Sequence, residues 1–323
     1  MPKVLITTPF PEAMVQLFKQ LVGEAVEVDF VTTPAEDEFN QKVAGAEILV
    51  NGFRKIDAAT LDKAPGVKFI QQIGVGYNNL DLGLLRERGV LAANTPGVNA
   101  ESVAEHTLLL MLALLKRFEE SVNITRANKW STLKILQGGV TELGAATVGL
   151  IGFGSIGQAV AARLKPFGSR VLYTARRRVA PEIEEKLGVS YATLPDLLAA
   201  SSIVSLHLPL NAETQNLIGE KELALMPPGS FLVNTARGDI VDEAALHQAI
   251  LSGHLGGAGL DVIQTEKAGS NPFTDLPQVT ITPHTAGASR SVMIKAAQMS
   301  AANVTRYLSG ERPLYILPEL ENR

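Results

Sequence analysis

The sequence predicts an α/β protein of two domains, each built on a doubly wound parallel sheet. Short apolar runs alternate with helix-like stretches through most of the chain, which is typical of parallel sheets covered by helices. A glycine-rich turn between a strand and a helix, at residues 147–157, begins a second half with the same architecture as the first. The 323 residues are enough for two domains with sizeable cores.

The first 98 residues contain five short apolar runs that we expect to be strands. These runs are 4–7, 26–30, 48–51, 69–72 and 90–93, and the helix-like stretches between them include 12–21, 36–44 and 58–64. Their spacing implies a parallel sheet. The turn Gly74-Val75-Gly76 lacks the third glycine of a phosphate-binding pattern. It is either an ordinary loop or a pair of exposed N–H groups that hold a small anion.

A long helix is expected to follow the first domain and to run to about Asn123. Ser102 and Glu105 have the spacing of a capping box, which favours a start near Asn99 or Ser102. The middle of this helix, T-L-L-L-M-L-A-L-L, is apolar on every side, so we expect it to be buried all round. Such a helix between two domains predicts a spine or a subunit interface.

The second half contains six expected strands and ends in a helix and an extended tail. The strands start at Thr147 and continue through 170–174, 203–206, 231–234, 257–261 and 279–282, and the helix covers about 288–308 and the tail 313–318. We expect the C-terminal helix to return to the first domain. The predicted domains are therefore residues 1–98 with 288–323, and residues 99–287.

A phosphate-binding pattern opens the second half. Gly152, Gly154 and Gly157 fall in G-x-G-x-x-G spacing between an apolar strand and a helix-like stretch, 158–165. The first glycine permits a tight turn, the second lets a pyrophosphate approach the backbone, and the third lets helix and strand pack closely. The helix N-terminus supplies free N–H groups for the phosphates. Because the pattern lies between a strand and a helix, it predicts a Rossmann dinucleotide-binding domain.

The residues after the second strand of this domain bear on which dinucleotide binds. NAD-binding domains place an acidic residue there, which accepts hydrogen bonds from the ribose hydroxyls. Here Ala175 is followed by Arg176, Arg177 and Arg178, with no carboxylate at the strand end. The guanidinium groups either bind a 2′-phosphate or form a solvated turn. The missing acid favours NADPH over NADH.

Composition and charge exclude several classes of protein. The net charge of −4 argues against a nucleic-acid binder, and the most apolar run, residues 108–115, is far shorter than the ~20 residues that cross a bilayer. The chain has no cysteine, which excludes disulfides, thiolate metal sites and cysteine nucleophiles. No histidine has metal-ligand spacing, so no metal is expected. The lack of cysteine and of a signal-peptide pattern at the N-terminus predicts a cytoplasmic protein.

One histidine stands out as a proton donor. His284 follows an expected strand end and precedes small residues that leave room for a ligand, and a histidine there is suited to protonate a carbonyl that is being reduced. Such a ring needs a carboxylate to hold one nitrogen, and Asp261, Glu266 and Asp275 are the candidates nearby. Glu266 lies just beyond a strand, on the side where α/β sheets bind ligands. Arg237 either binds a substrate carboxylate or is a surface charge.

Several segments, in the right order and spread over nearly the whole chain, resemble those of the D-isomer-specific 2-hydroxyacid dehydrogenases. They are T-V-G-L-I-G-F-G-S-I-G, H-L-P-L-N-A-E-T, L-V-N-T-A-R-G-D-I-V-D-E, G-L-D-V and T-P-H-T-A-G, with I-G-V-G-Y-N-N-L-D and N-T-P-G-V in the first half. The resemblance implies a catalytic set of Arg237, Glu266 and His284. The family's E-x-E-P pattern is Gln264-Thr265-Glu266-Lys267 here, so the glutamate is kept and the proline is absent.

The resemblance also implies binding residues. Val75 and Gly76 would offer backbone N–H groups to the substrate carboxylate. Cofactor contacts would fall on Ser155, Ile156, His207, Pro209, Thr214, Thr235, Ala236 and Asp261. Ala175 followed by Arg176 and Arg177 is similar to the NADPH-preferring glyoxylate/hydroxypyruvate reductases. Phe53, after the third strand, either forms a wall of the substrate pocket or is a surface residue. Arg54 either contacts a polar tail of the substrate or is a surface residue.

We therefore expect a flavodoxin-like substrate domain and a Rossmann domain with a 2-oxo acid bound in the cleft between them. The expected reaction is reduction of glyoxylate or hydroxypyruvate to a D-2-hydroxy acid by hydride transfer from NADPH, with His284 as acid/base. The alternatives are a reductase of a bulkier aryl or alkyl 2-oxo acid, or a non-catalytic dinucleotide sensor like the family's transcriptional corepressors. A homodimer through residues 101–123 is the expected assembly.

Overall fold

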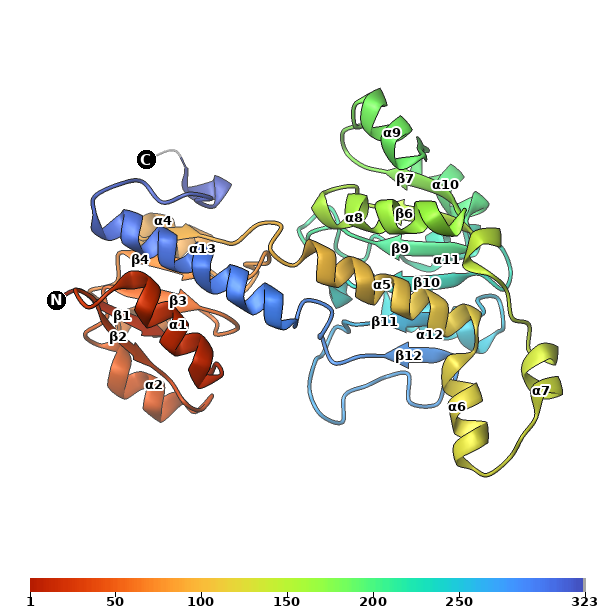
Figure 1. The fold of residues 1–323 in the computed structure, drawn as a ribbon, viewed down its shortest axis with the longest axis horizontal. Coiled ribbons are helices and arrows are strands. Elements are labelled where there is room, and N and C mark those ends of the chain that lie inside the picture. The colour runs from red at the N-terminus through yellow and green to blue at the C-terminus, as the bar shows by residue number, and fades with distance from the viewer. Residues whose placement is uncertain (322–323) are drawn as a thin grey trace. The chain divides into compact units, whose positions relative to one another are not determined.

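A computed structural model describes residues 1–321. The chain forms two compact units. Unit 1 consists of Met1–Asn99 with the chain from Ser289 onward, and unit 2 of Ala100–Ala288. Figure 1 shows that each unit is a sheet with helices on both faces. Both sheets are wholly parallel, which confirms the predicted fold class.

The sheet of unit 1 has the strand order β2-β1-β3-β4-β5, which is that of flavodoxin-like folds. Its strands are β1 (Lys3–Ile6), β2 (Glu27–Phe30), β3 (Ile48–Asn51), β4 (Phe69–Gln72) and β5 (Leu91–Ala93). Successive side chains of a strand enter opposite cores, so Val4 and Ile6 pack on one face and Leu5 on the other. This alternation places a helical layer on each face.

Two helices cover one face of this sheet and shorter elements cover the other. Helices α1 (Glu12–Val22) and α13 (Arg290–Leu308) lie side by side on the first face, as Figure 1 shows. The second face is covered by α2 (Glu36–Val43), α3 (Ala58–Asp62), α4 (Leu82–Arg88) and the 3₁₀ turn η4 (Pro318–Leu320). Helix α4 had not been predicted. Its ends are marked by local signals, since Asp81 caps the first turn and Gly89 ends the helix in the left-handed conformation.

The sheet of unit 2 has the strand order β12-β11-β10-β9-β6-β7-β8. Its strands are β6 (Thr147–Ile151), β7 (Arg170–Thr174), β8 (Val189–Tyr191), β9 (Ile203–Leu206), β10 (Phe231–Asn234), β11 (Gly257–Leu260) and β12 (Val279–Ile281). The order is that of a Rossmann sheet with one strand added beside β11. The sequence predicted six of these strands and missed β8. This edge strand is three residues long, and Ser190 and Tyr191 are exposed.

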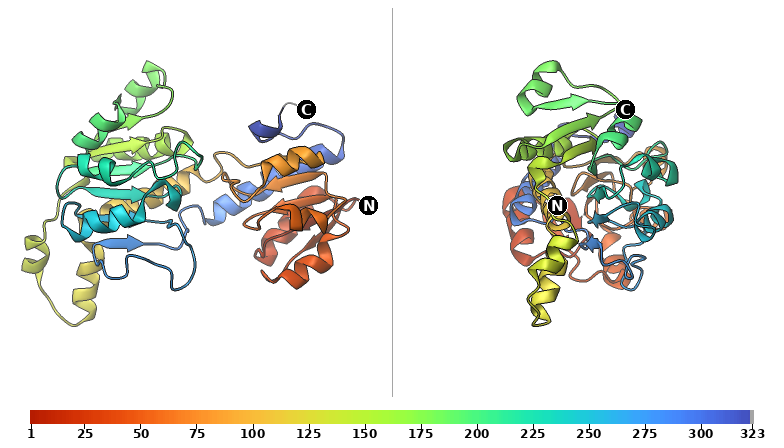
Figure 2. Two further views of the ribbon diagram at one scale, coloured as in Figure 1. Left: turned by 180° about the vertical axis from the view of Figure 1, so that it is seen from behind. Right: turned by 90° about the vertical axis from the view of Figure 1, so that its right-hand side faces the viewer.

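Helices pack on both faces of the unit 2 sheet. Helices α5 (Ala100–Leu115) and α8 (Ser155–Leu164) cover one face, and α10 (Leu194–Ala200), α11 (Glu220–Leu225) and α12 (Glu243–Leu251) cover the other, seen from behind in Figure 2. Helix α5 packs closely on β11, because a Cβ on Gly259 would lie 3.0 Å from Cβ of Leu110. The remaining helices are α6 (Phe118–Arg126), α7 (Thr132–Gln137) and α9 (Pro181–Leu187), with 3₁₀ turns at η1 (Leu143–Ala145), η2 (Lys165–Phe167) and η3 (Gly238–Ile240).

The structure corrects three predictions about the long apolar helix. The helix ends at Leu115, because Arg117 adopts a left-handed conformation (φ 48°) and a separate helix, α6, begins at Phe118. The predicted capping box is wrong, since the helix starts at Ala100 and Ser102 donates its hydroxyl to the carbonyl of Ala286 instead. Burial all round is also wrong, because the helix packs on the sheet with one side and leaves Leu109 54% exposed.

Candidate active site

Three side chains singled out from the sequence lie after neighbouring strands of the unit 2 sheet. Arg237 follows β10, Glu266 lies in the loop after β11, and His284 follows β12. These strands are adjacent and parallel, so their carboxyl ends form one edge of the sheet. In open α/β sheets, ligands bind at that edge.

The imidazole of His284 is hydrogen-bonded to the carboxylate of Glu266. Nδ1 of His284 lies 2.8 Å from Oε2 of Glu266, and because an ionised carboxylate only accepts, Nδ1 carries the proton. The two side chains are 39% and 43% exposed, so small ligands can reach them. Nε2 of His284 has no partner among the described residues of unit 2. The ring is therefore held at one nitrogen and presents the other at the sheet edge.

A buried carboxylate fixes the backbone that carries His284. His284 has a φ of 54°, a conformation that costs free energy for a residue with a Cβ. Its N–H donates to the carbonyl of Asp261 at 2.8 Å. The buried carboxylate of Asp261 accepts from the backbone N–H groups of Thr285 (2.9 Å) and Ala286 (2.8 Å). Asp261, expected from the resemblance to contact cofactor, thus lies beneath the His284 loop and holds it.

Arg237 is a half-buried cation without an ion-pair partner among the described residues. Its guanidinium donates to the neighbouring carbonyl of Ala236 at 2.6 Å, which leaves most of its donors free. Burial lowers the pKa of Arg237, and the charge of Glu266 offsets part of that shift. A guanidinium removed from water with free donors favours binding of an anion, above all a carboxylate that accepts two parallel hydrogen bonds.

Asn234 shapes the turn that carries Arg237, and the sequence reasoning missed it. Its side-chain amide donates to the carbonyl of Arg237 at 2.9 Å, and its oxygen accepts from the N–H of Ala236 at 2.9 Å. The residue is buried at the end of β10. A polar residue that ends the apolar strand F-L-V-N was the signal that could have identified it.

The glycine-rich turn has the geometry that a pyrophosphate requires. A Cβ on Gly157 would lie 2.4 Å from the carbonyl oxygen of Gly152, so this glycine permits the close approach of α8 to the turn. A Cβ on Gly154 would meet no atom within 4 Å, so the space beside it is open to a ligand. Gly154 is also the N-cap of α8 and provides no side-chain cap, which leaves the first N–H groups of the helix available. The residues present therefore fit a dinucleotide pyrophosphate.

The arginines after β7 are not equivalent. Arg178 makes two hydrogen bonds to Glu184, at 2.8 and 2.7 Å, and Tyr173 donates its hydroxyl to the same carboxylate at 2.6 Å. These contacts, with Arg178 as the larger cause, lower the pKa of Glu184 to about 2. Arg176 and Arg177 are exposed and have no ion pair within the described chain. Two free guanidinium groups therefore follow β7, and no carboxylate stands at the strand end.

The other residues expected to contact the dinucleotide follow the central strands of the same sheet. Ser155 and Ile156 form the first turn of α8, His207 and Pro209 follow β9, Thr214 lies in the next loop, and Thr235 and Ala236 follow β10. The hydroxyl of Thr235 is buried and lies 3.0 Å from that of Thr107 on α5. The hydroxyl of Thr214 donates to the carbonyl of Pro209 at 2.7 Å. These residues lie at the edge where the fingerprint also lies.

In unit 1, the turn 74–76 presents its amides and turns its carbonyls inward. The carbonyl of Gly74 accepts from the N–H of Thr95, that of Val75 from the side chain of Asn94, and that of Gly76 from Gln72. The N–H groups of Val75 and Gly76 have no acceptor among the described residues of this unit. This arrangement favours the anion-binding interpretation of the turn over an ordinary loop.

The loop after β3 contains one free side chain and one that is already occupied. Phe53 is 82% exposed, so it is available to a ligand. Arg54 packs its guanidinium 3.9 Å from the ring centre of Phe39 and pairs with Glu36. In this conformation its guanidinium is paired with Glu36, and the contact with a polar substrate tail stays a prediction.

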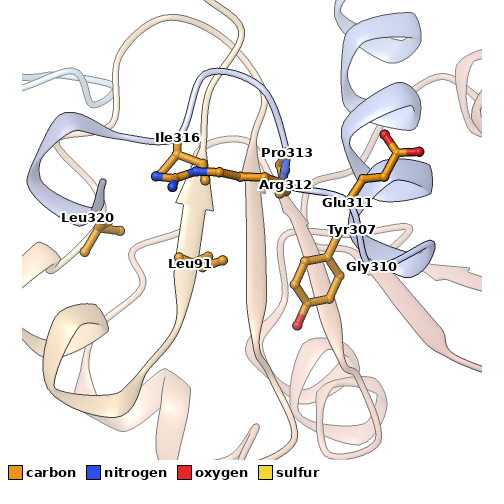
Figure 3. Close-up of a pocket in the computed structure, with 8 residues that line it drawn as sticks. All are labelled: Leu91, Tyr307, Gly310, Glu311, Arg312, Pro313, Ile316 and Leu320. Atoms are coloured by element: carbon orange, nitrogen blue, oxygen red, sulfur yellow. The ribbon is translucent and has the colours of Figure 1, made fainter. Parts of the chain in front are cut away.

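A separate hollow of about 300 Å³ lies in unit 1 beside β5 and the C-terminal turn (Figure 3). Its lining is largely apolar and contains none of the residues singled out from the sequence: it consists of Leu91, Tyr307, Gly310, Glu311, Arg312, Pro313, Ile316 and Leu320. Residues 1–321 contain no cluster of metal-ligating side chains and no helix long and apolar enough to cross a membrane. The polar groups suited to chemistry are those at the strand ends described above.

His207 gives the site a measurable dependence of stability on pH. Its Nε2 lies 3.0 Å from the hydroxyl of Ser205, whereas its Nδ1 is sealed from solvent without a partner in the described chain. Burial lowers the pKa of His207 to about 3. At pH values between the unfolded pKa of 6.5 and this folded pKa, His207 binds a proton in the unfolded chain but not in the folded protein. The free energy of unfolding therefore falls as the pH drops through this window.

We expect His207→Asn to remove this component of acid sensitivity. The wild-type free energy of unfolding should lose up to ~1.4 kcal/mol per pH unit from this group as the pH falls below its unfolded pKa. Urea unfolding of both proteins over that range measures the two slopes. Equal slopes would show that the histidine titrates normally in the folded protein.

Comparisons with known proteins identify relatives of this chain. A family model described as "D-isomer specific 2-hydroxyacid dehydrogenase, NAD binding domain" matches residues 108–286. The chain is 36% identical to a glyoxylate reductase of Thermococcus litoralis, with 100% of this chain and 97% of the relative covered. It is 39% identical to a glyoxylate reductase of Aeropyrum pernix, covering 100% and 96%.

Among solved structures, the fold is similar to D-lactate dehydrogenase from Aquifex aeolicus in complex with NAD and lactic acid. That structure is 29% identical in sequence, with a TM-score of 0.85 over 95% of this chain and 96% of the other. The family model covers the Rossmann unit with its fingerprint, and the relatives cover the whole chain. The chain therefore belongs to the D-isomer-specific 2-hydroxyacid dehydrogenase family, whose members bind a nicotinamide dinucleotide.

Proposed function

We propose that this protein reduces a small 2-oxo acid, with glyoxylate or hydroxypyruvate favoured, to the D-2-hydroxy acid with NADPH as the hydride donor. The observation that carries the proposal is the His284–Glu266 hydrogen bond, which lies at the ligand edge of a dinucleotide-binding sheet with Arg237 on the adjacent strand. Two relatives that match this chain over its full length are glyoxylate reductases. Their substrate supports the choice of a two- or three-carbon 2-oxo acid.

In the proposed mechanism, His284 donates the proton. The charged ring holds one proton on Nδ1, shared with Glu266, and one on Nε2, which faces the substrate. The nicotinamide, when bound, supplies a hydride to the substrate's C2. As the C=O bond becomes a C–O bond, His284 transfers its Nε2 proton to the oxygen, so the alkoxide becomes a hydroxyl. Glu266 stabilises the cationic ring until that transfer.

Arg237 is proposed to bind the substrate carboxylate and to polarise the carbonyl. Its guanidinium lacks an ion pair in the described chain, so an anionic substrate restores the charge balance at this half-buried position. Its positive charge also stabilises the negative charge that grows on the carbonyl oxygen in the transition state. The free amides of Val75 and Gly76 are proposed as a second set of donors for the same carboxylate.

The proposed preference for NADPH is based on the residues that follow β7. Arg176 and Arg177 are exposed and form no ion pair in the part of the chain that is described, whereas Arg178 forms an ion pair with Glu184. No acid at the strand end is available to accept hydrogen bonds from a ribose 2′-hydroxyl, or to repel a 2′-phosphate. Two guanidinium groups suit a phosphate dianion.

We also propose a homodimer formed through residues 101–123 and the segment that follows them. Large apolar side chains are exposed here, which is costly in water and typical of a protein interface. They are Leu109, Phe118, Trp130, Leu133 and Leu136, with Trp130 88% exposed. The cytoplasm as the protein's location stays a prediction from the cysteine-free sequence.

One assay separates the proposed reaction from the two alternatives. Oxidation of NADPH and of NADH is followed with glyoxylate, hydroxypyruvate, pyruvate and phenylpyruvate. The proposal expects the highest kcat/KM with NADPH and one of the first two acids. Faster turnover of phenylpyruvate would favour a bulkier substrate, and tight NADPH binding without any turnover would favour a dinucleotide sensor.

His284→Asn should lower kcat by ~10²–10⁴, because the variant has no acid to protonate the alkoxide. The matched control is His247→Asn, which removes a second histidine paired with a carboxylate, since Nε2 of His247 lies 3.1 Å from Asp275. The control should keep wild-type kcat. Near-wild-type turnover by the His284 variant would refute its role as the acid.

The double variant Arg176→Ala/Arg177→Ala should raise KM for NADPH by ~10–100-fold while KM for NADH changes little, because the two exposed charge-assisted contacts together contribute ~1.4–2.7 kcal/mol and each 1.4 kcal/mol is a factor of about ten. Arg178→Ala is the matched control, since that guanidinium is bound to Glu184. The control should shift the ratio of the two KM values much less. An unchanged ratio in the double variant would contradict the proposed 2′-phosphate site.

A further inference from the structure

Glu266 lies in a long segment without helix or strand. The chain between Leu260, which ends β11, and Val279, which begins β12, forms only turns and bends. A segment of this length has many conformations unless it is fastened at particular points. The hydrogen bond between Glu266 and His284 needs one of these conformations, so the fastening of the segment decides whether the bond forms.

The segment is fastened two residues before Glu266. The backbone N–H of Gln264 donates to Oε1 of Glu243 at 2.6 Å. The side-chain amide of Gln264 donates to the carbonyl of Val241 at 3.1 Å. Glu243 begins α12 and Val241 precedes that helix. One residue is therefore tied to the start of α12 through both its backbone and its side chain.

The same segment also touches the turn that carries Arg237. A Cβ on Gly238 would lie 2.1 Å from the carbonyl carbon of Ile263 and 2.4 Å from the nitrogen of Gln264. Position 238 therefore has to be glycine for the two backbones to come this close. This contact and the two hydrogen bonds of Gln264 fix the distance between the turn of Arg237 and the segment that leads to Glu266.

Among the described residues, no side chain packs against Gln264 and Glu243 on the side that faces a hollow. Both line a hollow of about 430 Å³, with Ala244, His247, Gln248 and Pro272. Burial raises the pKa of Glu243, and the charge of Asp239 adds to that shift, whereas the N–H of Gln264 opposes it. The Gln264 N–H thus stabilises the charged form of the Glu243 carboxylate. The two hydrogen bonds of Gln264 in turn hold the segment against α12.

We propose that Gln264 and Glu243 are positioning residues that set the approach of Glu266 to His284. The inference rests on the proposed role of that pair in the reaction. A carboxylate at position 264, as in the E-x-E-P pattern, could not donate to the carbonyl of Val241 and would stand beside the carboxylate of Glu243. The amide of Gln264 provides a donor where this chain lacks the proline of that pattern.

The test is Gln264→Glu, with Gln248→Glu as the matched control. Both substitutions add a carboxylate to the lining of the same hollow, but the side chain of Gln248 makes no hydrogen bond among the described residues. Gln264→Glu should lower kcat at least tenfold and leave KM for NADPH unchanged, and Gln248→Glu should keep both. Adding Glu243→Gln to Gln264→Glu should recover part of kcat, because an amide at 243 removes the repulsion between the two carboxylates while its oxygen can still accept from the backbone N–H of residue 264.

A second readout does not need turnover. A histidine Nδ1–H bonded to a carboxylate gives a downfield proton NMR signal, identified here by its loss in His284→Asn and in Glu266→Gln. The signal should persist in Gln248→Glu and disappear or broaden in Gln264→Glu. Wild-type kcat together with an unchanged signal in folded Gln264→Glu would overturn the inference. If the wild-type protein reduces no 2-oxo acid, the proposed function fails while the NMR comparison still decides the positioning role.

Discussion

The proposed chemistry of this protein depends on the hydrogen bond between His284 and Glu266. This bond fixes the proton on Nδ1, orients the ring and leaves Nε2 for a substrate. The two residues are separated in the chain by a loop and a strand, so the bond exists only if both are placed correctly. Asp261 holds the His284 loop from beneath, and Gln264 ties the Glu266 segment to α12. The polar contacts around the pair therefore serve its geometry.

The parallel sheet explains why these groups meet. The strands of unit 2 are parallel, so their carboxyl ends lie along one edge of the sheet. Residues far apart in the chain therefore lie along this edge: the glycine-rich turn after β6, the arginines after β7, Arg237 after β10 and His284 after β12. The amides of α8 that are proposed to bind phosphate and the proposed acid thus belong to one sheet. The turn at Val75 and Gly76, proposed to bind an anion, is held in unit 1 by contacts to Asn94 and Gln72.

Much of this could be predicted from the sequence. Strands at 48–51, 69–72, 170–174, 203–206 and 231–234 were predicted with the bounds that the structure has, because most residues of each are buried. Strand β8 and helix α4 were missed because they are short and partly exposed. The long helix was extended too far because the break at Arg117 lies in a residue that is rarely left-handed, so nothing in the apolar pattern marks it. Motifs indicated the candidate site residues, whereas the contacts of Asn234, Glu243 and Gln264 are tertiary and leave no periodic signal.

In the proposed reaction, Glu266 prepares His284 to protonate the product of hydride transfer. Single-turnover oxidation of NADPH by the loaded enzyme, mixed with saturating glyoxylate, tests it most directly in the wild-type protein and in Glu266→Gln. We expect the variant to bind NADPH as the wild type does and to oxidise it ~10²-fold more slowly, since an amide cannot stabilise the charged ring. Equal rates of NADPH oxidation in the two proteins would contradict it.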